Sequence, residues 1–354
     1  MLNWFKSYLS DRKQFTFVNG VNSKTASVNY GVPQGPVLGL LLFLLYVNDI
    51  QNAFTNATPK LFADDINLFI FHKDLKTLYS LANMELELLN EWLLAHRLSL
   101  SIGADKDTTH TLFSQKKHPD TKNLPKLHIS GQVVPYTDTI KYLGVLLDSG
   151  LSFKNHIKNL YEKLNKYVGI FYHVRHMLPT KCRRVLYFSF IFSYIYYCAE
   201  IYGNATKATL KPLQLAQNRA LRALQSKNKY YPVNEMHKNY SILKINDIIQ
   251  YKQSKIIHSL LTGDKKLPPV LKKLIIPSRT IHTYKTRHQK SVYEIKPRRP
   301  IAKRQLKCIP SKEWNSLPKV ITQTLTHGEF KNEFYHYKLQ SYKESDLNFA
   351  TERI

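Results

Sequence analysis

Two adjacent carboxylates, Asp64 and Asp65, lie between short apolar runs in the segment Leu61–Leu68. Burying an unpaired carboxylate is costly, so acids in such a place usually pair with a cation or bind a metal ion. The flanking runs predict the two strands of a hairpin, whose tip exposes both acids enough to hold Mg²⁺. Successive strand side chains point to opposite faces, so we expect one acid to be the main ligand. Asp-Asp alone is also an ordinary turn sequence.

A Gly- and Pro-rich segment, Tyr30–Gly39, precedes this pair and runs into an apolar stretch that ends near Ile50. The glycines and prolines predict a tight turn, and the apolar stretch predicts a buried helix. In the turn, Gly35 lets the backbone approach a ligand closely, and Gln34 can position one by hydrogen bonds. Such a segment by itself can also be an ordinary loop.

Periodicity and turn signals predict the elements that position these residues. We expect a helix over 2–9, strands over 14–18 and 28–32 around an Asn-Gly turn, a hairpin over 61–71, a helix over 75–96, a second β-rich region over 127–147, helices over 156–177, from 179 and over 206–224, and a last ordered element over 314–342. The stretch 185–199 is rich in Ser and Tyr, which favours a buried helix over a membrane span.

The charge of the chain points to a polyanionic partner. The 354 residues include 52 Lys and Arg against 25 Asp and Glu, a formal net charge of +27. Folding does not require such an excess, which is typical of proteins that bind nucleic acid. An apolar content of 43% excludes wholesale disorder. Three well-separated cysteines make neither a disulfide framework nor a zinc site, which favours a reduced intracellular protein.

The two segments, in this order, resemble the palm of reverse transcriptases from the jockey-like branch of non-LTR retrotransposons. That family has Gly-Val-Pro-Gln-Gly-Ser-Val-Leu-Gly-Pro-Leu-Leu-Phe followed by Tyr/Phe-Ala-Asp-Asp; here Pro36 replaces the Ser and Leu40 replaces the second Pro. Further segments also resemble the family, namely 4–14, 141–148 with Phe153 and His156-Ile157, 217–222 and 314–318. The resemblance covers nearly the whole chain.

The resemblance implies a role for each of these residues. Asp64 would hold the two Mg²⁺ ions of a complete site, with Mn²⁺ as an alternative ion, and Asp65 would support it. Gln34 and Gly35 would lie near the templating base and the incoming nucleotide. Lys106 would lie near the departing phosphate, although a solvated loop lysine is the competing interpretation. The implied partners are an RNA template, a DNA primer and deoxynucleoside triphosphates, with no membrane.

The resemblance also implies a fold, which we expect to be α+β. Residues 1–150 would form a partial palm with a primer-side hairpin, 151–262 a helical thumb-like domain, 263–310 a basic linker or arm, and 311–354 a C-terminal element. The arm carries 14 Lys or Arg over residues 264–307. We expect the lysines of the first thumb helix and Lys181, Arg183 and Arg184 of the next to follow the nucleic-acid backbone. The family resemblance places such a chain in the nucleus or in a cytoplasmic ribonucleoprotein particle.

One part of the expected site has no match. The family places another metal-binding aspartate upstream of the segment that begins here at Trp4, and Asp11 is the only acid before Gln34. We therefore expect an N-terminally truncated polymerase that is inactive alone. The alternatives are a non-catalytic nucleic-acid-binding fragment and a pseudogene product, whose incomplete sheet would expose an edge and apolar surface.

Overall fold

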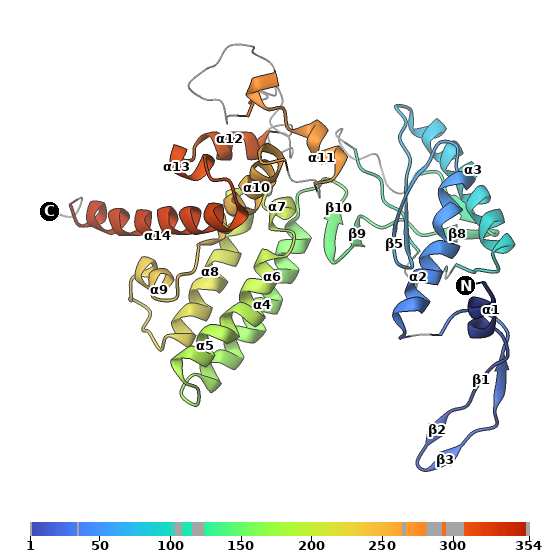
Figure 1. Ribbon diagram of the computed structural model, residues 1–354. Coiled ribbons are helices and arrows are strands. Elements are labelled where there is room, and N and C mark those ends of the chain that lie inside the picture. Colours follow the sequence, from blue (N-terminus) through green and yellow to red (C-terminus); the bar gives the residue numbers. More distant parts are fainter. Residues whose placement is uncertain are drawn as a thin grey trace. The chain divides into compact units, whose positions relative to one another are not determined.

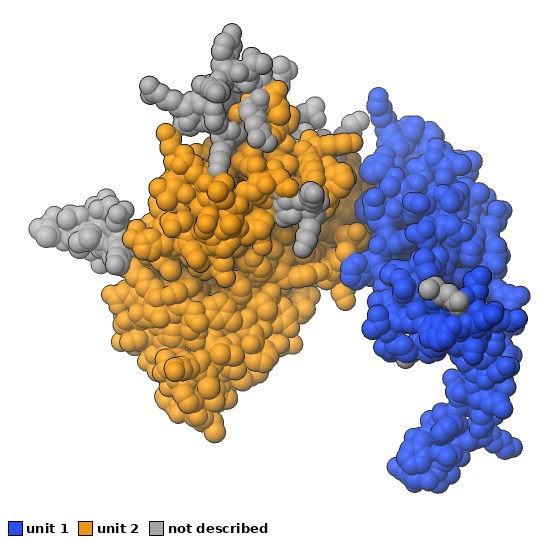
Figure 2. All heavy atoms as spheres, viewed as in Figure 1, with its two compact units in different colours: residues 1–111, 115–137 blue, residues 112–114, 138–354 orange. Residues whose placement is uncertain are grey.

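The computed structural model describes residues 2–33, 35–100, 102, 108–114, 124–263, 267–280, 292–294 and 308–351 (Figure 1). It is a mixed α+β structure with small antiparallel sheets, as the sequence predicted. The chain divides into two compact units (Figure 2). One comprises residues 1–111 and 115–137, and the other comprises residues 112–114 and 138–354. We call them unit 1 and unit 2. The predicted domain boundaries stay predictions.

Unit 1 begins with helix α1 (Leu2–Leu9), which has the predicted bounds. A long two-stranded ribbon follows, made of β1 (Arg12–Gln14), β2 (Phe17–Val18), β3 (Val21–Asn22) and β4 (Ala26–Val28). Its turn is Asn19-Gly20, and both residues have positive φ, as in the type I′ turns that match strand twist.

The predicted return strand over 28–32 is wrong. Strand β4 occupies Ala26–Val28, and Val28 pairs with Arg12. The turn pairs Val18 with Val21, and one extra residue between β3 and β4 then shifts the register, so the return strand begins and ends earlier than its apolar residues suggested. The chain then leaves the ribbon at Gly31, where φ is +79°.

The central hairpin of unit 1 consists of β5 (Thr58–Phe62) and β6 (Asp65–Phe69), paired antiparallel as predicted. Helix α3 (Leu75–Ala95) follows; the Asp74 side chain caps it by accepting the Thr77 N–H at 2.8 Å. Strands β7 (Leu127–Ile129) and β8 (Gln132–Val134) form another hairpin, and β7 contacts α3. A small core forms between these elements from Ile50, Tyr79, Ala82, Leu89, Leu93, Leu127, Ile129 and Val134.

Helix α2 (Val37–Tyr46) follows the Gly-Pro segment. The prediction of a buried helix here is wrong. Val37 is 89% exposed and Leu45 is 65% exposed, and Gly39 is its one buried residue. The helix is apolar on every side, but in the described part of the chain it contacts mainly η1 (Asn48–Ala53). The apolar run therefore predicts the helix correctly but not its burial.

Unit 2 is mainly helical. Its hairpin is formed by β9 (Thr139–Tyr142) and β10 (Val145–Asp148). Its helices are α4 (Lys154–Val174), α5 (Thr180–Tyr187), the π-helix η3 (Phe188–Phe192), α6 (Ser193–Tyr196), α7 (Ala199–Tyr202), α8 (Lys207–Leu224), α9 (Val233–Asn239), α10 (Ile245–Leu261), α11 (Pro269–Leu274), the short η4 (Ser278–Thr280), α12 (Ile309–Asn315), α13 (Lys319–Thr322) and α14 (His327–Thr351).

The core of unit 2 lies between α4, α8 and α10, and α4 and α8 pack side by side. Fully buried aromatic residues, among them Tyr187, Tyr202 and Trp314, fill it together with Leu213 and Phe330. Among the described residues no helix is long and apolar enough to cross a membrane. Most of the predicted basic arm, including residues 281–291 and 295–307, lies outside the described residues.

Candidate metal and nucleic-acid site

The acidic pair lies at the turn between β5 and β6. Phe62 pairs with Asp65, so Ala63 and Asp64 form a two-residue turn and Asp65 begins β6. Both carboxylates are exposed. Ala63 has a φ of +51°, a conformation that is unfavourable by about 1 kcal/mol for a residue with a β-carbon. Strain of this kind is often found at functional sites.

The hairpin is fixed by the face opposite Asp65. Ile66 and Leu68 of β6, and Ile70 directly after it, pack against the unit 1 core. Asp65 and Asn67 lie on the other face of the strand, because side chains alternate. The packed face of β6 therefore holds the turn in place, and the division of tasks between Asp64 and Asp65 stays a prediction.

A buried carboxylate, Glu85 on α3, fixes the chain just before β5. It accepts the Thr55 hydroxyl at 2.7 Å and the Asn56 N–H at 2.7 Å. Burial alone would raise the pKa of Glu85, but these hydrogen bonds outweigh burial and lower its pKa. Glu85 thus stays ionised in the core and ties the start of the hairpin to α3.

Two exposed carboxylates provide the oxygen ligands that Mg²⁺ prefers, so Asp64 and Asp65 fit one side of a metal site. In the described ranges no group of three or more His, Cys, Asp or Glu side chains comes together. In a metal site the pair would supply part of the ligand set, and a further carboxylate or other ligand oxygens would have to complete it.

The Gly-Pro segment is anchored at both ends. Arg12 donates from Nη2 to the carbonyls of Gly31 at 2.6 Å and Tyr30 at 3.2 Å. At the other end, the Gly39 N–H donates to the Pro36 carbonyl at 3.1 Å. Between them Gly35 is exposed with a φ of +101°, which an L-residue with a side chain rarely adopts. The chain is thus held in a turn that displays the backbone at Gly35.

Two of the predicted site residues, Gln34 and Lys106, lie outside the described residues. The other three belong to unit 1, where η1 contacts both α2 and β5. Ile50 of η1 is fully buried in the unit 1 core. This short helix therefore connects the element after Gly35 to the strand before Asp64.

The basic residues of unit 2 that we expected to contact phosphates divide into two groups. Lys154, Lys158, Lys163, Lys166 and Lys181 are exposed and available to phosphates. Arg183 and Arg184, which we expected to do the same, have structural partners. Arg183 donates to the carbonyls of Leu178 at 2.8 Å and Leu224 at 3.3 Å, and Arg184 donates to the Tyr240 carbonyl at 3.1 Å. Their guanidinium groups therefore close the ends of neighbouring helices.

The chain is similar to curated polymerases of mobile elements. It is 24% identical over 265 residues to the RNA-directed DNA polymerase from mobile element jockey of Drosophila melanogaster. This match covers 72% of the chain and 28% of the relative. It is also 24% identical over 291 residues to the probable RNA-directed DNA polymerase from transposon BS and 26% identical over 285 residues to that from transposon X-element, both of the same fly.

This chain is similar to RNA-directed DNA polymerases of mobile elements. The predicted resemblance is confirmed. The chain spans about three tenths of these polymerases, with 28% of the jockey relative, 31% of the BS relative and 30% of the X-element relative covered. No family profile and no solved structure matches the chain.

The structural roles of two residues were missed in the sequence analysis. Arg12 looked like part of a basic surface turn, but it fixes the Gly31 end of the Gly-Pro segment. His156 was noted for its resemblance alone, yet it is buried and its pKa falls to about 4, because burial and the nearby charge of Lys163 disfavour protonation. Two sequence signals could have indicated these roles. Arg12 is a charged residue near a glycine turn, and His156 is a histidine at an apolar position of a helix.

Proposed function

We propose that this chain is part of the polymerising region of an RNA-directed DNA polymerase of a non-LTR retrotransposon. One observation carries the proposal. In a relative of such polymerases, the two adjacent carboxylates are exposed at a strained turn whose opposite face is packed into a core. In this proposal unit 1 belongs to a palm, the helices of unit 2 belong to a thumb, and the chain works in the nucleus or in a cytoplasmic ribonucleoprotein particle.

Each residue then has a stated task. Asp64 is the main ligand for Mg²⁺ and Asp65 supports it, while Gln34 and Gly35 face the templating base and the nucleotide. When bound, the ions favour deprotonation of the primer 3′-hydroxyl and offset charge on the leaving pyrophosphate. Lys106 takes a place near that pyrophosphate. The exposed lysines of α4 contact phosphates of the RNA template and DNA primer, independently of sequence.

A second candidate function is nucleic-acid binding without catalysis. The described residues bring only two of the ligands that a polymerase metal site needs, whereas the lysines of α4 need no metal to bind phosphate. We therefore propose that the chain alone binds primer–template but does not extend it.

Metal binding at the turn can be tested without any activity. In the purified chain, Mn²⁺ should broaden the amide resonances around residues 63–65, since a paramagnetic ion acts over short distances. Asp64→Asn should remove this broadening. Asp11→Asn, at another exposed acid of unit 1, should preserve it. Broadening that survives in the Asp64→Asn/Asp65→Asn double variant would show that the turn does not hold the ion.

Binding and extension separate the two functions. Fluorescence anisotropy with an RNA–DNA primer–template should show an affinity that falls steeply with salt and is unchanged by Asp64→Asn. Primer extension with Mg²⁺ should be undetectable. If the chain extends the primer and Asp64→Asn abolishes this extension, the proposal of an incomplete metal site is refuted and the chain alone is a polymerase. An absence of measurable affinity for the hybrid would refute both functions.

A further inference from the structure

Two histidines from different helices meet where α10 ends and α14 begins. His258 lies in the last turn of α10, and His327 is the first residue of α14. Their Nδ1 atoms are 3.2 Å apart. His258 is 1% exposed, whereas His327 is exposed. The pair, which belongs to unit 2, therefore combines a buried ring with one that solvent reaches.

The ring of His258 is held by aromatic side chains and by acceptors. It stacks on Phe330 with the ring centres 4.7 Å apart, and the Trp314 ring centre lies 6.3 Å away. Its Nε2 is 3.2 Å from the Thr324 carbonyl oxygen, which can only accept, so Nε2 carries the proton. The Thr324 hydroxyl donates to the Ile321 carbonyl at 2.8 Å, and its oxygen faces the same Nε2 at 3.2 Å. In the neutral ring, Nδ1 of His258 is therefore an acceptor.

The ring of His327 continues this chain of hydrogen bonds. Because His258 Nδ1 accepts, His327 Nδ1 is the donor between the two rings. The Nε2 of neutral His327 then accepts the Ser259 hydroxyl at 3.2 Å. A serine oxygen can also accept, so His327 can carry its proton on Nε2 instead and keep the same partner. In that tautomer both Nδ1 atoms present lone pairs, and neither ring has lost a proton.

The spacing of the two rings fits two ligands of one tetrahedral ion. Zinc–nitrogen bonds of about 2.0–2.1 Å place two nitrogen ligands about 3.3 Å apart and their ring centres about 5.2 Å apart. The observed distances are 3.2 Å between the Nδ1 atoms and 5.1 Å between the ring centres. Neighbouring nitrogens of a square-planar ion would be closer, about 2.9 Å apart. Rings that met head-on would have centres about 5.5 Å apart, so these rings are inclined, as two ligands of one ion are.

The other two ring nitrogens already have the partners that metal-binding histidines use. A metal-bound histidine donates its remaining N–H to a carbonyl, a carboxylate or water. The Thr324 carbonyl takes this place for His258, and Ser259 Oγ takes it for His327. Among the described residues no third His, Cys, Asp or Glu side chain joins the pair, so water would fill the remaining positions. Imidazole nitrogen suits Zn²⁺, whereas Mg²⁺ prefers oxygen ligands.

We propose that His258 and His327 bind Zn²⁺ through their Nδ1 atoms, with water in the remaining positions, and that the ion ties the start of α14 to the end of α10. The inference goes beyond the proposed polymerase function and does not depend on it, because neither histidine belongs to the acidic turn or to the lysines of α4.

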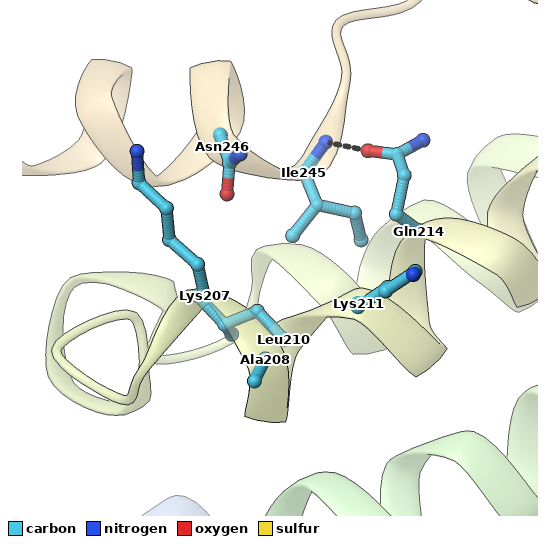
Figure 3. A pocket seen from close by; sticks show the side chains of 7 residues that line it. All are labelled: Lys207, Ala208, Leu210, Lys211, Gln214, Ile245 and Asn246. Carbon is cyan, nitrogen blue, oxygen red and sulfur yellow. Dashed lines mark hydrogen bonds between the residues drawn. The ribbon is translucent and has the colours of Figure 1, made fainter.

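The opposite end of α10 provides an internal control (Figure 3). A pocket of about 320 Å³ at this end is lined by Lys207 and Lys211 of α8. The Ile245 N–H at the helix start donates to the Gln214 side chain at 2.8 Å. Protonated amines offer no lone pair to a metal ion and repel its charge. Zinc should therefore slow hydrogen exchange at the His258 end of α10 and leave this end unchanged.

The binding test uses the full chain, without a histidine tag, and Zn²⁺ alone. Calorimetric titration should show a binding event whose affinity falls about tenfold or more in His327→Ala and about tenfold in Ser259→Ala. His327 is exposed, so its replacement should leave the fold intact. The matched control is His336→Ala, which removes another exposed histidine of α14 and should change the affinity less than about twofold. Mg²⁺ should produce no such binding event.

Two further measurements report on the pair itself. When free Zn²⁺ is about a hundred times its dissociation constant, amide exchange over 256–261 and 328–332 should slow by up to about 100-fold, because the ion must leave before the helices separate. With ¹⁵N-labelled histidine, His327 should carry its proton on Nδ1 without zinc and on Nε2 with zinc. Equal losses of zinc affinity in His327→Ala and His336→Ala, or a His327 proton that stays on Nδ1 when zinc is added, would overturn the proposal.

Discussion

Gly39 sets the distance between the Gly-Pro segment and α2, and replacing it with alanine tests that packing. Its backbone is in an ordinary helical conformation, so alanine is not excluded by φ. A β-carbon there would lie 2.4 Å from the Pro33 carbonyl oxygen, whereas ordinary contacts begin at 3.4 Å. About 1 Å must be gained by moving backbone rather than a flexible side chain.

The expected effect follows from two opposing contributions. Overpacking costs about 1–3 kcal/mol, and alanine's better helix propensity returns about 1 kcal/mol. We therefore expect Gly39→Ala to lower the free energy of local unfolding around residues 33–46 by up to about 2 kcal/mol. Hydrogen–deuterium exchange of these amides, compared with α3 in the same chain, measures this change.

Gly169 is the matched control. It lies in the interior of α4, is exposed, and would place a β-carbon with nothing within 4 Å. Gly169→Ala should therefore raise local stability in α4 by about 0.5–1 kcal/mol. If Gly39→Ala also raises protection around residues 33–46, the Pro33 carbonyl does not restrict α2, and the packing described for this segment is wrong.

Two further predictions concern buried titratable groups. His156 and His237 have pKa values of about 4, well below the ordinary 6.5, mainly because burial disfavours their charged forms. Below pH 6.5 the unfolded chain therefore binds more protons than the folded chain, so the free energy of unfolding of unit 2 should fall by about 2 kcal/mol for each histidine between pH 7 and pH 5. Urea unfolding followed by near-UV circular dichroism measures this change. A free energy of unfolding that does not vary with pH would contradict it. Glu85→Gln should lower stability by about 1–3 kcal/mol, because an amide N–H would face the Thr55 and Asn56 donors. Exposed Glu87 on the same helix is the control, and Glu87→Gln should change stability less than about 0.5 kcal/mol; equal effects in thermal unfolding would refute the role of the buried carboxylate.

Much of the fold could be predicted because its signals are local. The hairpin around Asp64 follows from alternation, since Ile66, Leu68 and Ile70 mark one face of the second strand and Asp64 lies in the turn before it. Helices α3 and α8 begin where a short polar side chain can cap them. Asp74 accepts the Thr77 N–H, and Thr206 accepts the Thr209 N–H.

The errors arose where an outcome depends on distant residues. The apolar run of α2 predicts a helix correctly, but burial depends on what packs against it, and periodicity does not reveal this. The register of β4 depends on an extra residue between β3 and β4 as well as on the turn, and its residue Val28 pairs with Arg12, sixteen residues away. The structural partners of Arg183 and Arg184 were also missed, because the carbonyls that accept their hydrogen bonds lie at the ends of helices far away in the sequence; their predicted phosphate contacts stay predictions.

The residue types of the candidate site could be predicted from the sequence, but the contacts that hold these residues in place could not. Adjacent acids and a Gly-Pro turn identify the residue types that a polymerase metal site uses, whatever the surrounding fold. The contribution of Arg12 to the position of Gly31 could not be predicted, because it requires the ribbon to bring residues 12 and 31 together. The same holds for His156, whose tautomer is fixed by a backbone N–H from another element.

The two units differ in how firmly they can hold their side chains. In unit 1 one small cluster supports the Asp64 turn, and α2 leaves large apolar side chains in solvent. In unit 2 the lysines of α4 stand on a helix whose other face includes Leu164 and Phe171, both buried in the larger core. Local unfolding follows the density of buried contacts, so the acidic turn should open more readily than the basic helix. Phosphate contacts by the lysines of α4 would therefore have a more rigid support than metal contacts at the Asp64 turn, so we expect binding to be the more robust of the two proposed activities.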